Sequence, residues 1–511
     1  MPLPATIEEC HVLIAQLVSM VSALTSQVEI LKLEITQLKE KLNQNSNNSS
    51  KPPSQDFKSN KKKKSDTKLS SGRKTGGQPG HKGMTRELLN ISEVDKIEKC
   101  ILPLHCRCGG KILKHDNYYR WQVHELPIIK MHVTEYQCEK GRCAACRLRY
   151  TAALPQVAKN TMIGPRLMSL MAMFPAKYHV SRQLMLHFLK EIFDFKVSLG
   201  TVFNKEKKLA NMTTPVCEDI LNHIKNSAFL HADETGIREN GHSSWLWTFS
   251  SKEASYFKMA DSRGTKVLKD TMADYEGVVI SDRYGAYNLY DDVNRQLCWA
   301  HLKRDFKRIS ESQHKVIARI GAQLLTEQDK LFEHWHGFKK GLFDRQILQD
   351  KCKPIINAVE NLLESCTYLS PEFRAVGTCK NILKHSQALW TFLYVESIEP
   401  TNNHAEQQIR PSVIWGKVSF GSKSKTGSLF IANLSTLLAT CKKQGKNSWR
   451  FLQDLIISAY EQGEMPQLVE YPSHPHPVPL PPAGEGTLKI ISASRLPHFP
   501  MREMDYLIYN Q

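Results

Sequence analysis

The chain has 511 residues, of which 41% are hydrophobic and 23% are charged, so it can bury cores in roughly two to four domains. Its formal net charge of +18 favours nucleic acid over a membrane surface as a partner, and half of that charge lies between Lys51 and Arg86. The sequence shows neither a signal-peptide pattern nor an unbroken apolar run of about 18 residues, so neither secretion nor a transmembrane helix is expected.

Residues 1–45 are predicted to form a coiled coil. Between Ile7 and Leu42, apolar residues recur in alternating steps of three and four, with Ile or Val dominating one core position and Leu the other. This heptad pattern favours a parallel two-stranded coil, so the chain is expected to form at least a dimer with itself. The alternative is an amphipathic helix that packs on its own domain.

Residues 46–98 form a polar, basic linker that cannot bury a core and is predicted to be disordered alone. Its lysine run makes it a candidate arm for binding DNA phosphates. The run consists of Lys61, Lys62, Lys63 and Lys64. The alternative is a solubilising tether. The arm is favoured because the basic block lies between a dimerising segment and a predicted DNA-binding module.

Residues 99–155 are predicted to form a zinc-ribbon domain. Five of the thirteen cysteines cluster here, namely Cys106, Cys108, Cys138, Cys143 and Cys146. The second pair has the Cys-x-x-Cys spacing that suits tetrahedral zinc, whereas the first pair is compressed to Cys-x-Cys. One structural zinc is therefore expected on Cys106, Cys108, Cys143 and Cys146, with His105 and Cys138 as alternatives for the fourth ligand.

Residues 156–227 are predicted to be helical. One helix is expected to begin near Pro165, a second near Ser181, and a third after Ser198, whose side chain can cap it. Two helices around a short turn suit a helix-turn-helix that lies in a DNA groove. An ordinary helical hairpin fits the pattern equally well.

Residues 228–309 are predicted to form the first part of a ribonuclease-H-like catalytic core. Apolar runs predict strands at 229–233, 245–249, 255–258, 277–282 and 296–299, with helices at 264–275 and 300–309. This order matches a ribonuclease-H core in which one acid lies on the first strand and a second acid ends the fourth.

Residues 310–398 read as a helical insertion into that core. Residues 399–465 are predicted to complete the core and to add C-terminal helices, after a basic loop at 416–425. Residues 466–511 are rich in proline and are expected to be disordered. The expected fold class is multidomain α+β, in which a coiled coil, a zinc ribbon and a helical DNA-binding segment precede an α/β catalytic core.

Three acids are the candidate catalytic residues: Asp233, Asp282 and Glu406. The first two end short apolar runs, and Glu406 lies in the first turns of a predicted helix. Carboxylates at the ends of two neighbouring strands and on a facing helix can converge on two divalent cations. Such a cation pair clamps the attacking and leaving oxygens of an in-line phosphoryl transfer. On a basic chain, this pattern indicates cleavage of DNA.

These motifs resemble the large transposase subunit of the insertion sequence sixty-six family, a group of bacterial DDE transposases. The resemblance covers roughly residues 7–462. It rests on His231-Ala232-Asp233-Glu234-Thr235, on Ser281-Asp282-Arg283-Tyr284-Gly285, on Cys298-Trp299-Ala300-His301, on Asn402-Asn403-His404-Ala405-Glu406 and on the Gly-Gly-Gln-Pro-Gly-His segment. The compressed first cysteine pair and the proline-rich tail depart from the family pattern.

The resemblance implies Asp233, Asp282 and Glu406 as ligands of two Mg²⁺ ions. It implies cleavage at the ends of a bacterial insertion sequence and joining of the 3′-OH to target DNA. His301 is a candidate for contacting the scissile phosphate, against the alternative of a buried histidine at a helix start. The implied partners are DNA, a second copy of the chain and small accessory proteins of the same element, in the bacterial cytoplasm near the nucleoid and away from membranes.

Arg410, Lys417 and Lys423 are candidates for DNA phosphate contacts, against the alternative of a solvated basic face. The main competing function is a catalytically inactive, transposase-derived dimeric zinc protein that binds DNA as a repressor. A further alternative is a hydrolytic nuclease that does not join strands.

Overall fold

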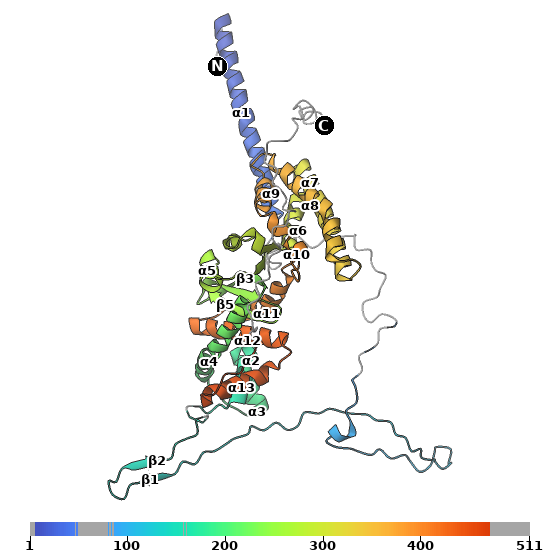
Figure 1. Cartoon of the computed structure of the whole chain (residues 1–511), viewed down its shortest axis with the longest axis vertical. Coiled ribbons are helices and arrows are strands. Elements are labelled where there is room, and N and C mark those ends of the chain that lie inside the picture. The colour runs from blue at the N-terminus through green and yellow to red at the C-terminus, as the bar shows by residue number, and fades with distance from the viewer. Residues whose placement is uncertain are drawn as a thin grey trace. The chain divides into compact units, whose positions relative to one another are not determined.

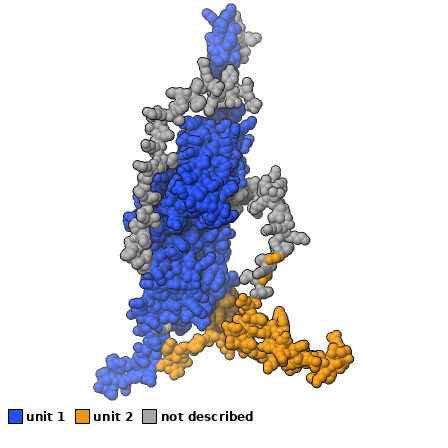
Figure 2. Space-filling model, turned by 45° about the vertical axis from the view of Figure 1, so that its right-hand side comes forward, with its two compact units in different colours: residues 1–56, 138–186, 197–511 blue, residues 57–137, 187–196 orange. Residues whose placement is uncertain are grey.

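A computed structural model describes residues 6–45, 48–49, 80, 83, 86–156, 158–159 and 161–470. The lysine run at 61–64 and nearly all of the proline-rich tail lie outside these residues. The chain divides into two compact units, one made of residues 57–137 and 187–196 and the other of the rest (Figure 2). The division falls inside the predicted zinc ribbon, between Gln137 and Cys138.

The N-terminal helix α1 (Ile7–Leu42) covers the predicted coiled-coil segment (Figure 1). Its seam residues are exposed in the single chain, with Leu24 at 56% and Leu31 at 55%. The helix therefore offers an uncovered apolar seam, and the two-stranded coil stays a prediction.

Among the described residues, Cys10–Leu42 is one helical stretch long and apolar enough to cross a membrane by length and composition. The sequence analysis expected no such helix because it looked for an unbroken apolar run, and Gln16, Ser19 and Ser22 interrupt the run. These residues add no charge, so the stretch stays apolar on average. This finding is weak support for a membrane span, since a heptad seam can have the same composition.

The larger sheet has five strands in the order β5-β4-β3-β6-β7. The first three strands form an antiparallel meander: β3 (Phe229–Glu239), β4 (His242–Ser250) and β5 (Ser255–Ala260). After helix α5 (Thr265–Met272), β6 (Val278–Ser281) pairs parallel with β3, and β7 (Arg295–Leu297) pairs parallel with β6. All five predicted strands are present in the predicted order.

Strand β3 is longer than the sequence pattern predicted. It continues past Asp233 to Glu239 and turns into β4 through Asn240 and Gly241, whose φ angles are +49° and +80°. Positive φ at both turn residues suits the twist of a tight hairpin, and Asn-Gly is the pair that most readily adopts it. The prediction that Asp233 ends its strand was wrong, because this turn lies seven residues further on.

Helices α11 (Asn403–Ser419) and α12 (Lys425–Lys443) cover one side of the meander. Leu246, Phe257, Ile409 and Ala432 form the apolar contact between them. The edge strand β5 is closed by α12, since Thr436 and Thr440 accept hydrogen bonds from the backbone N–H groups of Phe257 and Ser255. The predicted basic loop at 416–425 is shorter than expected because α11 continues to Ser419.

The predicted helical segments on either side of the core are present. The first contains α2 (Pro165–Ala176), α3 (Arg182–Phe193) and α4 (Leu199–Lys225), and Ser198 caps α4 through its side chain as predicted. Helix α4 packs on α12 and β5, and α13 (Ser448–Glu461) packs on α2. The choice between a helix-turn-helix and a helical hairpin stays open.

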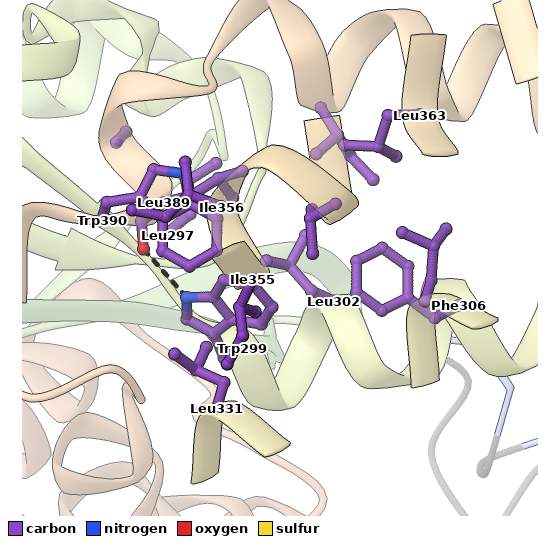
Figure 3. Close-up of a cluster of buried hydrophobic side chains, with 14 of the residues drawn as sticks. Leu297, Trp299, Leu302, Phe306, Leu331, Ile355, Ile356, Leu363, Leu389 and Trp390 are labelled. Carbon is purple, nitrogen blue, oxygen red and sulfur yellow. Dashed lines mark hydrogen bonds between the residues drawn. The ribbon is translucent and has the colours of Figure 1, made fainter. Parts of the chain in front are cut away.

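The helical insertion contains α7 (Lys315–Lys339), α8 (Arg345–Thr367), α9 (Arg374–Lys384) and α10 (Thr391–Tyr394). It follows α6 (Trp299–Ser310) and shares one hydrophobic cluster with strands β6 and β7 (Figure 3). Trp299 lies in this cluster and donates from its indole N–H to the Leu389 carbonyl at 2.9 Å. The insertion is thus packed on the sheet through a common core.

The remaining described elements are short. A 3₁₀ turn spans Ile91–Glu93, and β1 (Lys140–Arg142) pairs antiparallel with β2 (Arg149–Thr151). Three further 3₁₀ turns, Gly285–Leu289, Asp292–Asn294 and Gln387–Leu389, connect elements of the core.

Candidate active site

Strands β3 and β6 bring Asp233 and Asp282 to neighbouring positions. Their parallel register pairs His231 with Ile280. The same register continued by two residues sets Asp282 beside Asp233, at the spacing of adjacent strands, about 4.8 Å. Backbone N–H groups orient both carboxylates, from Glu234 to Asp233 at 2.9 Å and from Tyr284 to Asp282 at 2.8 Å.

Helix α11 carries Glu406 in its first turn, and buried Asn402 joins the start of this helix to β3. The Asn402 side chain donates to the Ala232 carbonyl at 2.7 Å and lies 3.0 Å from His231 Nδ1. Because His231 and Asp233 lie two residues apart in a strand, their side chains share the face that α11 covers. Asn402 lies in the motif around Glu406, but its role was not predicted from the sequence.

Helix α6 brings His301 to Glu406. His301 Nδ1 lies 3.6 Å from Glu406 Oε1, and both atoms are buried without a hydrogen-bond partner. Cys298, at the N-cap of α6, completes a group whose possible ligand atoms all lie within 4.8 Å of one another. Among the described residues this is the one such group of three, and it shares Glu406 with the predicted triad.

The three predicted acids interact electrostatically. Burial raises the pKa of Asp233 well above its usual range, and the carboxylates of Glu234, Asp282 and Glu406 raise it further. A bound cation would relieve this repulsion. Asp233 and Asp282 carry carboxylate oxygens of the kind that Mg²⁺ prefers, whereas the unpartnered Glu406 oxygen is grouped with Cys298 and His301.

Glu234 plays a different part from Asp233, because its side chain lies on the opposite face of β3. It accepts from the Arg263 guanidinium at 2.8 Å and from the buried Tyr287 hydroxyl. Burial and the nearby Asp282 carboxylate raise the pKa of Glu234, while Tyr287 and Arg263 act against that rise. This buried group supports the strand that carries Asp233. It was not predicted from the sequence, because Glu234 on its own does not indicate its partners.

A second buried polar group lies behind the start of α11. The rings of His231 and His404 are 4.9 Å apart, and His404 Nε2 lies 2.9 Å from Lys443 Nζ. Lys443 also donates to Ser250 Oγ at 2.7 Å and to the Ala254 carbonyl at 2.9 Å. Burial lowers the pKa of Lys443 to about 7, that of His404 to about 4 and that of His231 to about 3.

The predicted zinc ligands lie in two separate local turns. In the first turn, the N–H of Cys106 donates to the Gly110 carbonyl at 2.8 Å, and in the second, Arg147 N–H donates to the Cys143 carbonyl at 3.0 Å. Backbone hydrogen bonds lower the pKa of the Cys108 and Cys143 thiols. The two turns belong to different compact units, so the joint zinc site, with its alternatives His105 and Cys138, stays a prediction.

The predicted DNA-contacting residues that the structure describes are Arg410, Lys417 and Lys423. All three are exposed, the first two on α11 and the third in the turn before α12. Their exposure is compatible both with phosphate contacts and with a solvated basic face.

Fold and site together define an α+β protein in which two strands and a facing helix bring acidic side chains to one side of a five-stranded sheet. The chain belongs to the transposase IS66 family, whose family model matches residues 160–429. The matched range contains all three predicted acids. The resemblance seen in the motifs is thereby confirmed.

The chain also resembles a second family model and one curated protein. A family model described as a family of unknown function, DUF6444, matches residues 1–87. An uncharacterized protein, y4qI of Sinorhizobium fredii (strain NBRC 101917 / NGR234), is 27% identical over 252 residues, which cover 44% of this chain and 47% of that protein. The chain thus spans about half the length of this curated relative.

Proposed function

We propose that this chain is a DDE transposase that cuts DNA at the ends of a bacterial insertion sequence and joins the freed 3′-OH to target DNA. The observation that carries the proposal is that Asp233 interacts electrostatically with both Asp282 and Glu406 within a chain of the transposase IS66 family. A five-stranded sheet in which an antiparallel meander is followed by two parallel strands supports a ribonuclease-H-like core.

In this proposal Asp233, Asp282 and Glu406 hold two Mg²⁺ ions, which when bound activate the attacking oxygen and neutralise charge at the departing 3′ oxygen. The chain's own contribution is orientation. The N–H groups of Glu234 and Tyr284 fix one oxygen of each aspartate, which leaves the other oxygen for a ligand. The Asn402 contacts hold the start of α11, the helix that carries Glu406, against β3.

His301 is the proposed proton-bearing residue of the site. Its Nδ1 faces the Glu406 carboxylate and has no other partner, so a proton held at Nδ1 can bond either to Glu406 or to a phosphate oxygen that enters the site. Cys298 lies deeper, where burial raises the pKa of its thiol to about 11. A thiol that accepts from the Asn402 N–H at 3.1 Å is better suited to holding α11 in place than to nucleophilic attack.

The second candidate function is an inactive, transposase-derived protein that binds DNA as a zinc-containing dimer. The observation that favours it is the concentration of features outside the core: an uncovered heptad seam on α1 and two cysteine turns. The half-buried, mutually repelling acids argue against it, since a chain freed from catalysis has no need to retain such a costly group.

The discriminating experiment is cleavage of DNA that carries the element ends from the source locus, by the full chain with Mg²⁺ or Mn²⁺. Asp233→Asn, Asp282→Asn and Glu406→Gln should each lower cleavage at least about 10³-fold, or ~4 kcal/mol of transition-state stabilisation, while DNA binding persists. Ca²⁺ should support binding without cleavage. Wild-type protein that binds the ends and never cuts them would establish the inactive alternative, and a product that is cut but never joined would indicate a hydrolytic nuclease.

Matched controls must be acids that make no buried contacts. Glu234 is unsuitable because it is paired with Arg263, and Asp305 is unsuitable because it bridges Arg283 and Arg308. Exposed Asp291 and Glu276, which flank β6 on either side, are the appropriate pair. Asp291→Asn and Glu276→Gln should cleave at the wild-type rate.

A further inference from the structure

A groove with a volume of about 680 Å³ lies beside α11, the helix that carries Glu406. Its walls come from the end of α2, from one face of α11, from α12 and from the turn that begins α13. Gln407 and Gln408 open the α11 wall directly after Glu406, and the same wall continues to Trp415. The volume falls in the range of small-molecule sites, roughly 300–1,000 Å³.

The charge of the groove is one-sided. Three lysines line it, Lys177, Lys442 and Lys446, and none of its lining residues is acidic. Lys442 and Lys446 are exposed at its rim, while Lys177 donates to Ser448 Oγ at 3.0 Å. An occupant that carries negative charge is therefore favoured over a neutral or cationic one.

Aromatic rings supply a second property. Trp415 is 3% exposed and forms part of the floor, whereas Tyr178 is 56% exposed at the mouth. Trp449 is half-buried and is held from behind by Arg166, whose guanidinium lies 5.1 Å from the ring centre. A ring fixed in this way can stack on a planar ligand with little loss of conformational freedom.

The amides of Gln407 and Gln408 supply the third property, since each side chain offers both donors and an acceptor toward the edge of a planar heterocycle. Aromatic rings, lysines and amides in one concave site are the features by which proteins hold unpaired nucleotides. An acidic peptide would satisfy the lysines but would leave the exposed rings without a stacking partner.

We propose that this groove binds an unpaired nucleotide of the DNA substrate, with its base against the aromatic rings and its phosphate near the rim lysines. The inference rests on the proposed function for the source of the nucleotide, a strand end opened beside Glu406. Gln407 and Gln408 follow Glu406 on the same helix but lie about 100° and 200° further around its axis. A strand whose phosphodiester lies at Glu406 therefore reaches the groove by passing around α11, and the bound nucleotide is several positions from the cut.

The test uses the full chain with Ca²⁺ in place of Mg²⁺, so that cutting is not needed for a signal. The probe is a single-stranded thymidine octamer with one 5-iododeoxyuridine, compared with the same strand in a blunt duplex. We expect tryptophan fluorescence to be quenched by the single strand, and photocrosslinks to map to residues 177–178, 407–415 or 442–449. Trp449→Ala should weaken single-strand binding by roughly ten- to a hundredfold.

Gln408→Ala and Lys442→Ala should also weaken single-strand binding while duplex binding is retained. The matched control is Lys252→Ala, an exposed lysine in the turn between β4 and β5, outside the groove. Crosslinks confined to other segments, unchanged affinity in all three groove variants, or stronger displacement by poly-glutamate than by the octamer would each overturn the inference.

Failure of the inference and failure of the proposed function give different results. If the chain cuts element ends but shows no groove crosslink, the proposed function stands and the nucleotide site is refuted. If the Asp233→Asn protein binds DNA in the groove and the wild-type chain never cuts, the nucleotide site stands and the catalytic proposal is refuted.

Discussion

Replacing Asn402 with alanine should separate the start of α11 from β3 and destabilise the core. In the native chain the Asn402 side chain, which is only 1% exposed, serves both the Ala232 carbonyl and His231 Nδ1. The alanine variant leaves both of these buried groups without their partner, and each orphaned group costs about 1–3 kcal/mol. We therefore expect Asn402→Ala to lower the free energy of unfolding by about 2–6 kcal/mol.

Cleavage should fall as well, for a different reason. Glu406 lies one helical turn after Asn402, so loosening the start of α11 moves this carboxylate relative to Asp233. A misplacement of about 1 Å in a catalytic group can cost roughly a hundredfold in rate. The reduced rate should be seen at a temperature and denaturant concentration where the variant remains folded by circular dichroism.

The assay is urea denaturation of the full chain followed by tryptophan fluorescence, together with cleavage of element-end DNA. Asn403→Ala is the matched control, since Asn403 is the exposed neighbour at the first position of α11. Asn402→Asp should retain the His231 contact but lose the donor to Ala232, and so fall between wild type and alanine. An Asn402→Ala protein within about 0.5 kcal/mol of the Asn403→Ala control would refute the role assigned to this side chain.

Three further outcomes are expected. Burial lowers the folded-state pKa of His404 to about 4 and of His231 to about 3, so the unfolded chain takes up protons first as pH falls below about 6.5. Between pH 6.5 and 4, His231 should cost about 3 kcal/mol of stability and the partly exposed His404 a smaller amount, and both contributions are fully present above that window. A flat profile of denaturation midpoints there would contradict this. Cys143→Ser should abolish the one zinc per chain measured by elemental analysis, and zinc-free wild-type protein purified without chelator would refute the site. Replacing Leu24 and Leu31 with proline should make residues 1–50 monomeric in analytical ultracentrifugation, and a wild-type segment that is already monomeric at micromolar concentration would rule out the coiled coil.

The sequence was most informative where short-range pattern determines structure. Apolar runs predicted all five strands of the larger sheet, and Ser198 predicted the start of α4. The hairpin at Asn240–Gly241 could also have been predicted, because Asn-Gly between two apolar runs is a strong hairpin signal. Because this hairpin was not predicted, the predicted first strand was too short and ended at Asp233.

Contacts between distant segments were beyond prediction from a single sequence. Lys443 meets Ser250 and Ala254 about 190 positions earlier in the chain, and its lysine type gave no hint of burial. The pairing of Glu234 with Arg263 and Tyr287 is of the same kind. These polar groups form hydrogen bonds with one another only after the sheet and helices have packed. Residue type and local spacing therefore do not predict the pairs.

The position of Glu406 depends on the two ends of the helical insertion rather than on its interior. The backbone N–H of Trp299, where α6 begins, donates to the Pro400 carbonyl at 2.9 Å, and the Asn402 N–H donates to Cys298 Sγ at 3.1 Å. The chain therefore leaves and re-enters the core at the same place. Because the cost of closing a loop grows only slowly with its length, such a closure tolerates a long insertion. It also explains how a carboxylate so distant in sequence from Asp282 can face the same site.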